Sequence, residues 1–195
     1  TDGILHFSSA SVPFDRNRMF STLLRDREGD LWLGAFDAGY HISFCPEELS
    51  GHSLPFIKET LGFDTNINCM YEDEGGVLWF NQERNGIGLY APDSGTYNLH
   101  PYSQKRNVEV NLIARSRFPN TVWIASAFVP TVFRAQRQGM DIRFTDTLLL
   151  AHDGAETGHV TGILEDPAGR LWVMTERKLF VFKPDGHPLA AVTNL

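Results

Sequence analysis

The sequence predicts an all-β protein, a β-propeller of about four blades, each blade a four-stranded antiparallel sheet. All four tryptophans lie in one repeated phrase and are 47, 44 and 49 residues apart, at Trp32, Trp79, Trp123 and Trp172. A period in the mid-forties with four short strands per repeat is typical of a propeller blade. No segment shows a long helical periodicity. The whole chain, residues 1–195, is therefore interpreted as a propeller segment with one blade centred on each tryptophan.

The first two strands of each blade are predicted around a tight turn. The phrases read DREGDLWLG, DEGGVLWFN, RFPNTVWIA and DPAGRLWVM. Three of them have an aspartate six residues before the tryptophan and a glycine three residues before it, whereas the remaining phrase has Arg117 and Asn120 there. Asparagine tolerates a left-handed backbone better than other non-glycine residues, so we expect the turn in all four phrases. The flanking apolar stretches predict a strand on each side.

Two further strands complete each predicted blade. The third strands are expected at residues 40–44, 87–91, 132–135 and 179–183, and the fourth at LPFIKE, TYNLHPY and DIRFTDTL. Residues 50–62 have room for one helical turn, although Pro55 argues against more. GILHFSS at the start resembles outer strands without inner ones, and KPDGHPLAAVTNL at the end resembles the outer part of a blade. A propeller closes to protect its strand edges, and four blades could close alone. The ragged ends favour the alternative that the segment belongs to a larger ring.

The tryptophans and the aspartate turns each allow two interpretations. The tryptophans could stack on a ligand, but their regular recurrence favours packing between blades. The aspartates could bind a cation, with Asp26, Glu28 and Asp30 as the densest cluster, but the ordered ligand set of a calcium loop is absent. Side-chain capping of the turn is the favoured role. We therefore predict no metal site and no cofactor.

Composition excludes several classes of function. The formal net charge of −7 argues against non-specific nucleic-acid binding, which needs a basic surface. The sequence has no apolar run of about 18 residues that would span a membrane. Cys45 is expected to end a third strand and Cys69 to lie in an inner strand, and both are predicted to be unpaired thiols. No nucleophile motif, phosphate-binding loop or metal-ligand spacing occurs, so no catalytic residue is predicted.

A ligand would be expected at one end of the blades, which we call the rim. The rim carries the links between the second and third strands and the links between blades. Aromatic rings beside guanidinium donors in these links suit a carbohydrate or another small polar ligand. The candidate ligand-binding residues are Phe36, Asp37, Arg84, Phe128, Arg177, Arg16 and Arg18.

The repeated phrase resembles the two-component regulator propeller repeat. The resemblance is carried by MFSTLLRDREGDLWLG, INCMYEDEGGVLWFN and VTGILEDPAGRLWVM, and the third phrase in order departs from it. The segment LWLGAFDAGYHISF is similar to a stretch in the sensor region of hybrid two-component systems of gut Bacteroidetes. This resemblance implies a seven-bladed ring in the periplasm, in a homodimeric parent anchored in the inner membrane. It also implies a histidine kinase and a response regulator outside this chain.

The resemblance leads to the expectation of a sensor propeller that binds an oligosaccharide and has no catalysis of its own. A propeller enzyme, a lyase or a glycan hydrolase, is an alternative that needs a close acid–base pair at the rim. Its candidate residues are Asp37, Glu83, His152 and Glu176. A protein-interaction platform is the other alternative, and an exposed apolar rim would favour it.

Overall fold

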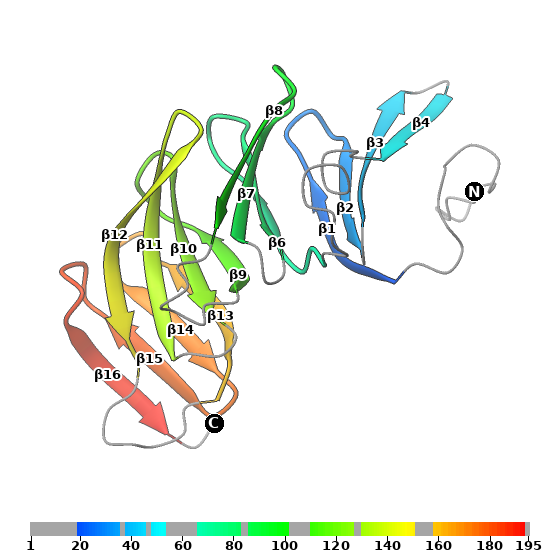
Figure 1. Cartoon of the computed structure of the whole chain (residues 1–195). Helices are drawn as coiled ribbons and strands as arrows, with labels where there is room; N and C mark the ends of the chain where they lie inside the picture. Colours follow the sequence, from blue (N-terminus) through cyan, green and yellow to red (C-terminus); the bar gives the residue numbers. More distant parts are fainter. Residues whose placement is uncertain are drawn as a thin grey trace.

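Sixteen strands form four separate four-stranded sheets in the computed structural model (Figure 1). The structure describes residues 19–35, 38–45, 48–53, 66–82, 86–101, 110–126, 130–150 and 158–193. Each sheet is an antiparallel meander of consecutive strands, as expected for a propeller blade. The described residues contain no helix, and therefore none that is long and apolar enough to cross a membrane.

The blades follow the chain in order. Blade 1 contains β1 (Phe20–Arg25), β2 (Leu31–Ala35), β3 (Ala38–Cys45) and β4 (Glu48–Ser53), and blade 2 contains β5 (Met70–Glu72), β6 (Leu78–Gln82), β7 (Gly86–Ala91) and β8 (Thr96–Pro101). Blade 3 contains β9 (Val110–Arg115), β10 (Thr121–Ser126), β11 (Thr131–Gln138) and β12 (Asp141–Leu149), and blade 4 contains β13 (Val160–Glu165), β14 (Leu171–Thr175), β15 (Lys178–Phe182) and β16 (Pro188–Thr193). The all-β fold of four-stranded propeller blades is therefore confirmed.

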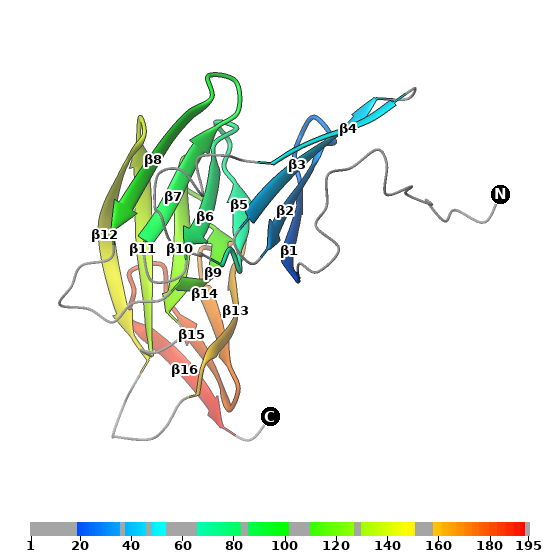
Figure 2. The ribbon, with the colours of Figure 1, turned by 45° about the vertical axis from the view of Figure 1, so that its right-hand side comes forward.

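The first strand of each blade lies on the inside of an arc. The strand β1 contacts β5, β5 contacts β9, and β9 contacts β13. Figures 1 and 2 show the four sheets following one another in chain order. Because successive strands run in opposite directions, the aspartate turns all lie at one end of the blades, which we call the turn end. The links that define the rim lie at the opposite end.

The hydrophobic core lies between the blades rather than within one of them. Trp79 of blade 2 packs in a buried cluster with blade 3 residues such as Val122 and Ile124. Trp123 of blade 3 packs in a second cluster with Leu171 and Val173 of blade 4. The Trp32 ring meets that of Tyr90 in blade 2 edge-on at 5.7 Å, whereas Trp172 is half-buried. The interpretation of the tryptophans as inter-blade packing residues is confirmed for these three interfaces.

The fourth strand of blade 1 lies earlier than predicted. LPFIKE lies outside the described residues, and the strand is formed by Glu48–Ser53. The sequence ELSGHS is poor in apolar residues. An outer strand depends more on a paired backbone than on a buried face, and all six residues of β4 pair with β3. This strand also overlaps the start of the suggested helical turn at 50–62. The other expected outer strands occur as β8, β12 and β16, whereas GILHFSS lies outside the described residues.

The turn of blade 3 is one residue longer than its counterparts. In blade 2, Leu78 precedes the tryptophan and pairs with Glu72, and the aspartate Asp73 follows Glu72 directly. Blades 1 and 4 have the same arrangement. In blade 3 the residue opposite Val122 is Arg115, so Ser116 takes the aspartate position. The expectation that Arg117 would stand there was wrong, because a fixed count back from the tryptophan misses the inserted residue.

The turn itself survives in blade 3 through its asparagine. Asn120 has φ of 51°, close to the 74° of Gly76 and the 78° of Gly169 at the corresponding point. Its side chain has a further role, since Asn120 Oδ1 accepts a hydrogen bond of 3.0 Å from Arg137.

Replacing Asn120 with valine should destabilise the protein, because a β-branched residue in the left-handed region costs about 1–2 kcal/mol. The control is Asn120→Gly, which also loses the amide but accepts the backbone conformation. Urea denaturation followed by tryptophan fluorescence measures both changes. Equal losses for valine and glycine would show that the amide alone matters.

Candidate functional site

Each tryptophan donates its indole N–H to a carboxylate at the turn end of the blades. Three indoles bond the aspartate of their own turn: Trp32 to Asp26 at 2.7 Å, Trp79 to Asp73 at 2.9 Å and Trp172 to Asp166 at 3.0 Å. The same aspartates accept backbone N–H groups within their turns, so the predicted capping role is confirmed. The aspartate of the repeat thus fixes the turn and the indole together.

Blade 3 obtains its carboxylate from the next blade. Ser116 is too short to serve Trp123, and the indole instead donates to Glu165 Oε2 of blade 4 at 2.7 Å. The same oxygen accepts the Ser116 hydroxyl at 2.8 Å and the Arg117 backbone N–H at 3.1 Å. The inserted turn residue is therefore compensated across the interface between blades 3 and 4.

Three of these four carboxylates also bind an arginine. Asp73 receives Nε of Arg137 at 2.6 Å and Nη2 at 3.1 Å. Glu165 pairs with Arg117 at 3.1 Å, and Asp166 pairs with Arg170 at 2.7 Å. Indole, carboxylate and guanidinium thus form a repeated triplet at the turn end. Sequence reasoning missed it, although the aspartate spacing before three of the four tryptophans was a usable signal.

The triplets hold their aspartates in the charged form. Burial acts to raise the pKa of Asp73, but the hydrogen bonds from Arg137 and Trp79 outweigh it and the pKa is lowered. The hydrogen bond from Trp172, followed by the contacts from Arg170, lowers the pKa of Asp166 to about 2. Both carboxylates therefore remain ionised well into the acid range.

The melting temperature should become insensitive to Asp166 in strong acid. A group whose pKa is lowered on folding contributes stability above its unfolded pKa, here 3.8, and loses it as the pH falls through its folded pKa of about 2. Replacing Asp166 with asparagine should therefore lower the melting temperature at about pH 6 and change it little at about pH 2. Thermal unfolding by circular dichroism across this range measures the difference. An unchanged difference at both ends would contradict it.

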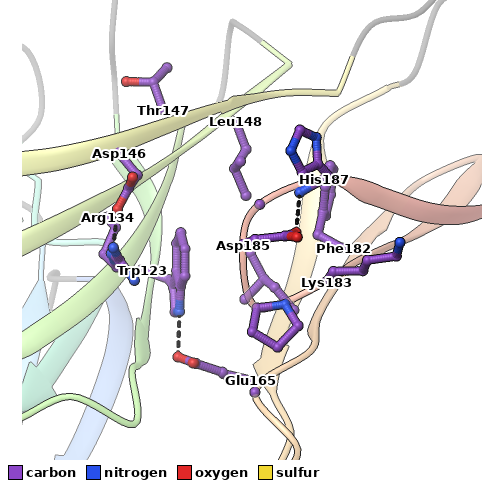
Figure 3. Close-up of a pocket in the computed structure, with 14 residues that line it drawn as sticks. Trp123, Arg134, Asp146, Thr147, Leu148, Glu165, Phe182, Lys183, Asp185 and His187 are labelled. Carbon is purple, nitrogen blue, oxygen red and sulfur yellow. Dashed lines mark hydrogen bonds and ion pairs between the residues drawn. The ribbon is translucent and has the colours of Figure 1, made fainter.

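A pocket of about 390 Å³ lies between blades 3 and 4 at the turn end (Figure 3). Trp123 and the ion pair of Arg134 with Asp146 line it from blade 3. The turn at 183–187, in which His187 N donates to Asp185 at 3.0 Å, lines it from blade 4. Acidic and basic side chains line this pocket together, so it favours neither sign of charge.

A smaller pocket of about 120 Å³ occupies the corresponding place between blades 1 and 2, and it is strongly acidic. Its wall contains Trp32, His41 and five carboxylates, those of Asp26, Glu28, Asp30, Glu72 and Asp93. The His41 ring stacks on Trp32 at 4.2 Å, and its Nε2 lies 2.9 Å from Asp30. The ligand atoms of Asp26, Asp30 and His41 lie within 4.8 Å of one another, so these three residues are the metal-capable group among the described residues.

The rim holds buried amides. Among the described residues, Asn66 Oδ1, Asn81 Nδ2 and Asn111 Oδ1 are buried side-chain atoms without a hydrogen-bond partner. Asn81 is the penultimate residue of β6 and Asn111 is the second residue of β9, so both are at the rim end of their strands. These unpaired amide atoms could form hydrogen bonds with a polar ligand or with the neighbouring links of the rim.

Most predicted ligand-binding residues lie outside the described residues: Phe36, Asp37, Arg84, Phe128, Arg16 and Arg18. Arg177 is exposed between β14 and β15 at the rim, where its backbone N–H donates to Thr175 Oγ1 at 3.3 Å. Of the residues considered for catalysis, Glu176 is described and accepts the His159 backbone N–H at 3.3 Å. Asp37, Glu83 and His152 lie outside the described residues.

Cys69 is a buried free thiol directly before β5, not within it as expected. Burial raises its pKa to about 12, so it is a packing residue without thiolate character. Cys45 ends β3 as predicted.

Comparison with known proteins identifies the repeat. Residues 154–177 match the family model described as two component regulator propeller. The chain therefore carries a two-component regulator propeller repeat around its fourth tryptophan, and the resemblance of that phrase is confirmed. No curated protein sequence matches the chain.

Solved structures share the fold. The extracellular domain of a protein described as a hybrid two component system of B. thetaiotaomicron matches with a TM-score of 0.59 and 18% identity, over 91% of this chain and 23% of that one. A second such domain from this organism gives 0.60 and 19%, over 86% and 20%. A gluconolactonase from Xanthomonas campestris gives 0.62 and 15%, over 90% and 62%. The chain spans about a fifth of the two extracellular domains.

Proposed function

We propose that the chain is part of an extracytoplasmic sensor and that its rim binds a glycan-derived ligand. The observation that carries the proposal is the two-component regulator propeller repeat at residues 154–177. The fold shared with extracellular domains of hybrid two-component systems supports it. The kinase that would receive the signal lies outside this chain, in a membrane-anchored, periplasm-facing parent.

The chemistry of the rim supports a polar ligand. Amide groups both donate and accept hydrogen bonds, and sugar hydroxyls do the same, so the half-buried amide of Asn111 is a suitable partner. Arg177 adds an exposed guanidinium at the same end. Ligand binding at the rim would bias the arrangement of propellers in a homodimeric parent and pass the change towards the membrane.

Calorimetric titration with a panel of oligosaccharides tests the proposal. We expect heat from a subset of glycans and none from peptides of similar size. Arg177→Ala should weaken that binding, whereas the matched control Arg143→Ala, an exposed arginine on β12 towards the turn end, should not. Binding of peptides alone would overturn the glycan proposal, and turnover of a glycan or a lactone would favour a propeller enzyme.

A further inference from the structure

One of the four indole-bound carboxylates, that of Asp26, has no guanidinium partner among the described residues. Asp73, Glu165 and Asp166 each bind an arginine. Asp26 accepts Trp32 Nε1 and the Asp30 backbone N–H, both at 2.7 Å, and no arginine or lysine among the described residues pairs with it. The triplet of indole, carboxylate and guanidinium is therefore incomplete in blade 1.

Residue differences between equivalent positions of the blades account for the missing guanidinium. Strand pairing shows which positions are equivalent. In blade 3, Val122 pairs with Ala135, and Arg137 follows two residues later. In blade 2 the equivalent Leu78 pairs with Tyr90, and Pro92 follows two residues later. Pro92 of blade 2 therefore stands where blade 3 carries Arg137.

A second source of a guanidinium, Arg170 two residues before Trp172, corresponds to Asp30 before Trp32. Neither of these two positions carries an arginine here. The third source, Arg117 directly after Ser116, corresponds to Arg27 directly after Asp26, and Arg27 pairs with Glu72 instead.

The place of the missing group is the acidic pocket of about 120 Å³ between blades 1 and 2, which both Asp26 and Pro92 line. Among the described residues, two basic groups lie near its five carboxylates. Arg27 lies outside the pocket lining and already pairs with Glu72 at 3.2 Å, and His41 lies against Asp30. The pocket therefore has a net negative charge, which attracts a cation, and the Trp32 indole orients the Asp26 carboxylate within it.

We propose that this pocket binds an alkylguanidinium group that another molecule supplies. The model for the bound state is internal: in the next interface the equivalent carboxylate of Asp73 holds the Arg137 guanidinium through two nitrogens. The planar fork of a guanidinium matches a carboxylate in this way, whereas a neutral isostere forfeits the charge-assisted bonds. The site lies at the turn end and is independent of the glycan site proposed at the rim.

The indole N–H signals of the four tryptophans test the proposal in ¹H–¹⁵N spectra, after assignment by single Trp→Phe variants. The probe is methylguanidinium, and methylurea is its uncharged isostere. We expect methylguanidinium to shift the Trp32 indole signal in a saturable manner and to leave that of Trp172 in place. Methylurea should bind roughly tenfold to a hundredfold more weakly, because it lacks the charge-assisted hydrogen bonds.

Matched variants locate the site. Asp26→Asn keeps an acceptor for Trp32 but removes the charge, and it should abolish the shift. Asp166→Asn makes the same change at the equivalent position of blade 4 and should leave probe binding intact. Pro92→Arg should supply the missing guanidinium from within the chain and block the probe.

Two sources of the group are distinguished by comparing agmatine with a blocked arginine amide. Tighter binding of agmatine assigns the pocket to a free small cation, and tighter binding of the blocked amide assigns it to an arginine side chain of a peptide. Equal shifts from methylurea, an absent shift at Trp32, or a response to Zn²⁺ without one to methylguanidinium would each overturn the proposal.

Discussion

Replacing Asp73 with alanine should destabilise the protein by about 3–5 kcal/mol, the cost of removing one partner of a buried ion pair. Asp73 is 1% exposed, and its side chain binds the Arg137 guanidinium and the Trp79 indole. It also accepts the backbone N–H groups of Gly75 at 2.8 Å and Val77 at 3.2 Å. Alanine would leave a guanidinium, an indole and a turn without their acceptor at the interface between blades 2 and 3.

A double-mutant cycle separates the ion pair from the turn. Arg137→Leu alone leaves Asp73 charged and buried, so it should also be costly, whereas adding it to Asp73→Ala should cost less than the sum. Urea denaturation gives the free energies of unfolding. Asp141→Ala, at an exposed position on β12, is the control and should change stability by less than about 0.5 kcal/mol. An Asp73→Ala loss as small as that of the control would refute the role assigned to Asp73.

Replacing Glu165 with alanine should cost about 2–3 kcal/mol and should be rescued by a second substitution in another blade. Glu165 is the sole acceptor described for the Trp123 indole, and it also accepts the Ser116 hydroxyl. Because Ser116 occupies the aspartate position of the repeat, Ser116→Asp should give Trp123 an acceptor from its own turn, as in the other blades. The double variant should therefore recover a large part of the lost stability.

The rescue distinguishes a missing acceptor from general disruption of the interface. Ser116→Asp in the wild-type background should be destabilising, because it places a carboxylate against Glu165. Glu28→Ala, an exposed glutamate in the turn of blade 1, is the matched control. If Ser116→Asp lowers the stability equally with and without Glu165, Trp123 does not need the acceptor.

The repeated phrase was enough to predict the blades, because a blade is a local meander whose strands and turns follow one another along the chain. The spacing of the tryptophans placed the first hairpins, and glycine or Asn120 marked their turns. Prediction failed for the outer strand β4, whose sequence has little apolar character. It also failed for the blade 3 turn, where strand pairing and not residue count sets the register.

The candidate sites depended on contacts between blades, which a local pattern does not encode. That Arg137 reaches Asp73 over 64 residues, or Trp123 reaches Glu165 over 42, follows from the stacking of neighbouring sheets. The capping role of the aspartates was predictable because it is local. Their bond to the indole could have been anticipated from the constant spacing, since both groups emerge at the same end of one hairpin.

The borrowed acceptor of Trp123 makes the repeats unequal as folding units. In a solenoid-like array, stability is a sum of the terms for each repeat and for each pair of neighbours. In blades 1, 2 and 4 the indole N–H donates to an aspartate of the same blade, so separation from a neighbouring blade would leave this hydrogen bond intact. In blade 3 the indole donates to Glu165 of blade 4, so blade 3 is thermodynamically tied to blade 4. A boundary for truncation or blade exchange placed between residues 150 and 158 would therefore separate an indole from its acceptor, whereas one placed after blade 1 would leave the indole of Trp32 bonded to Asp26.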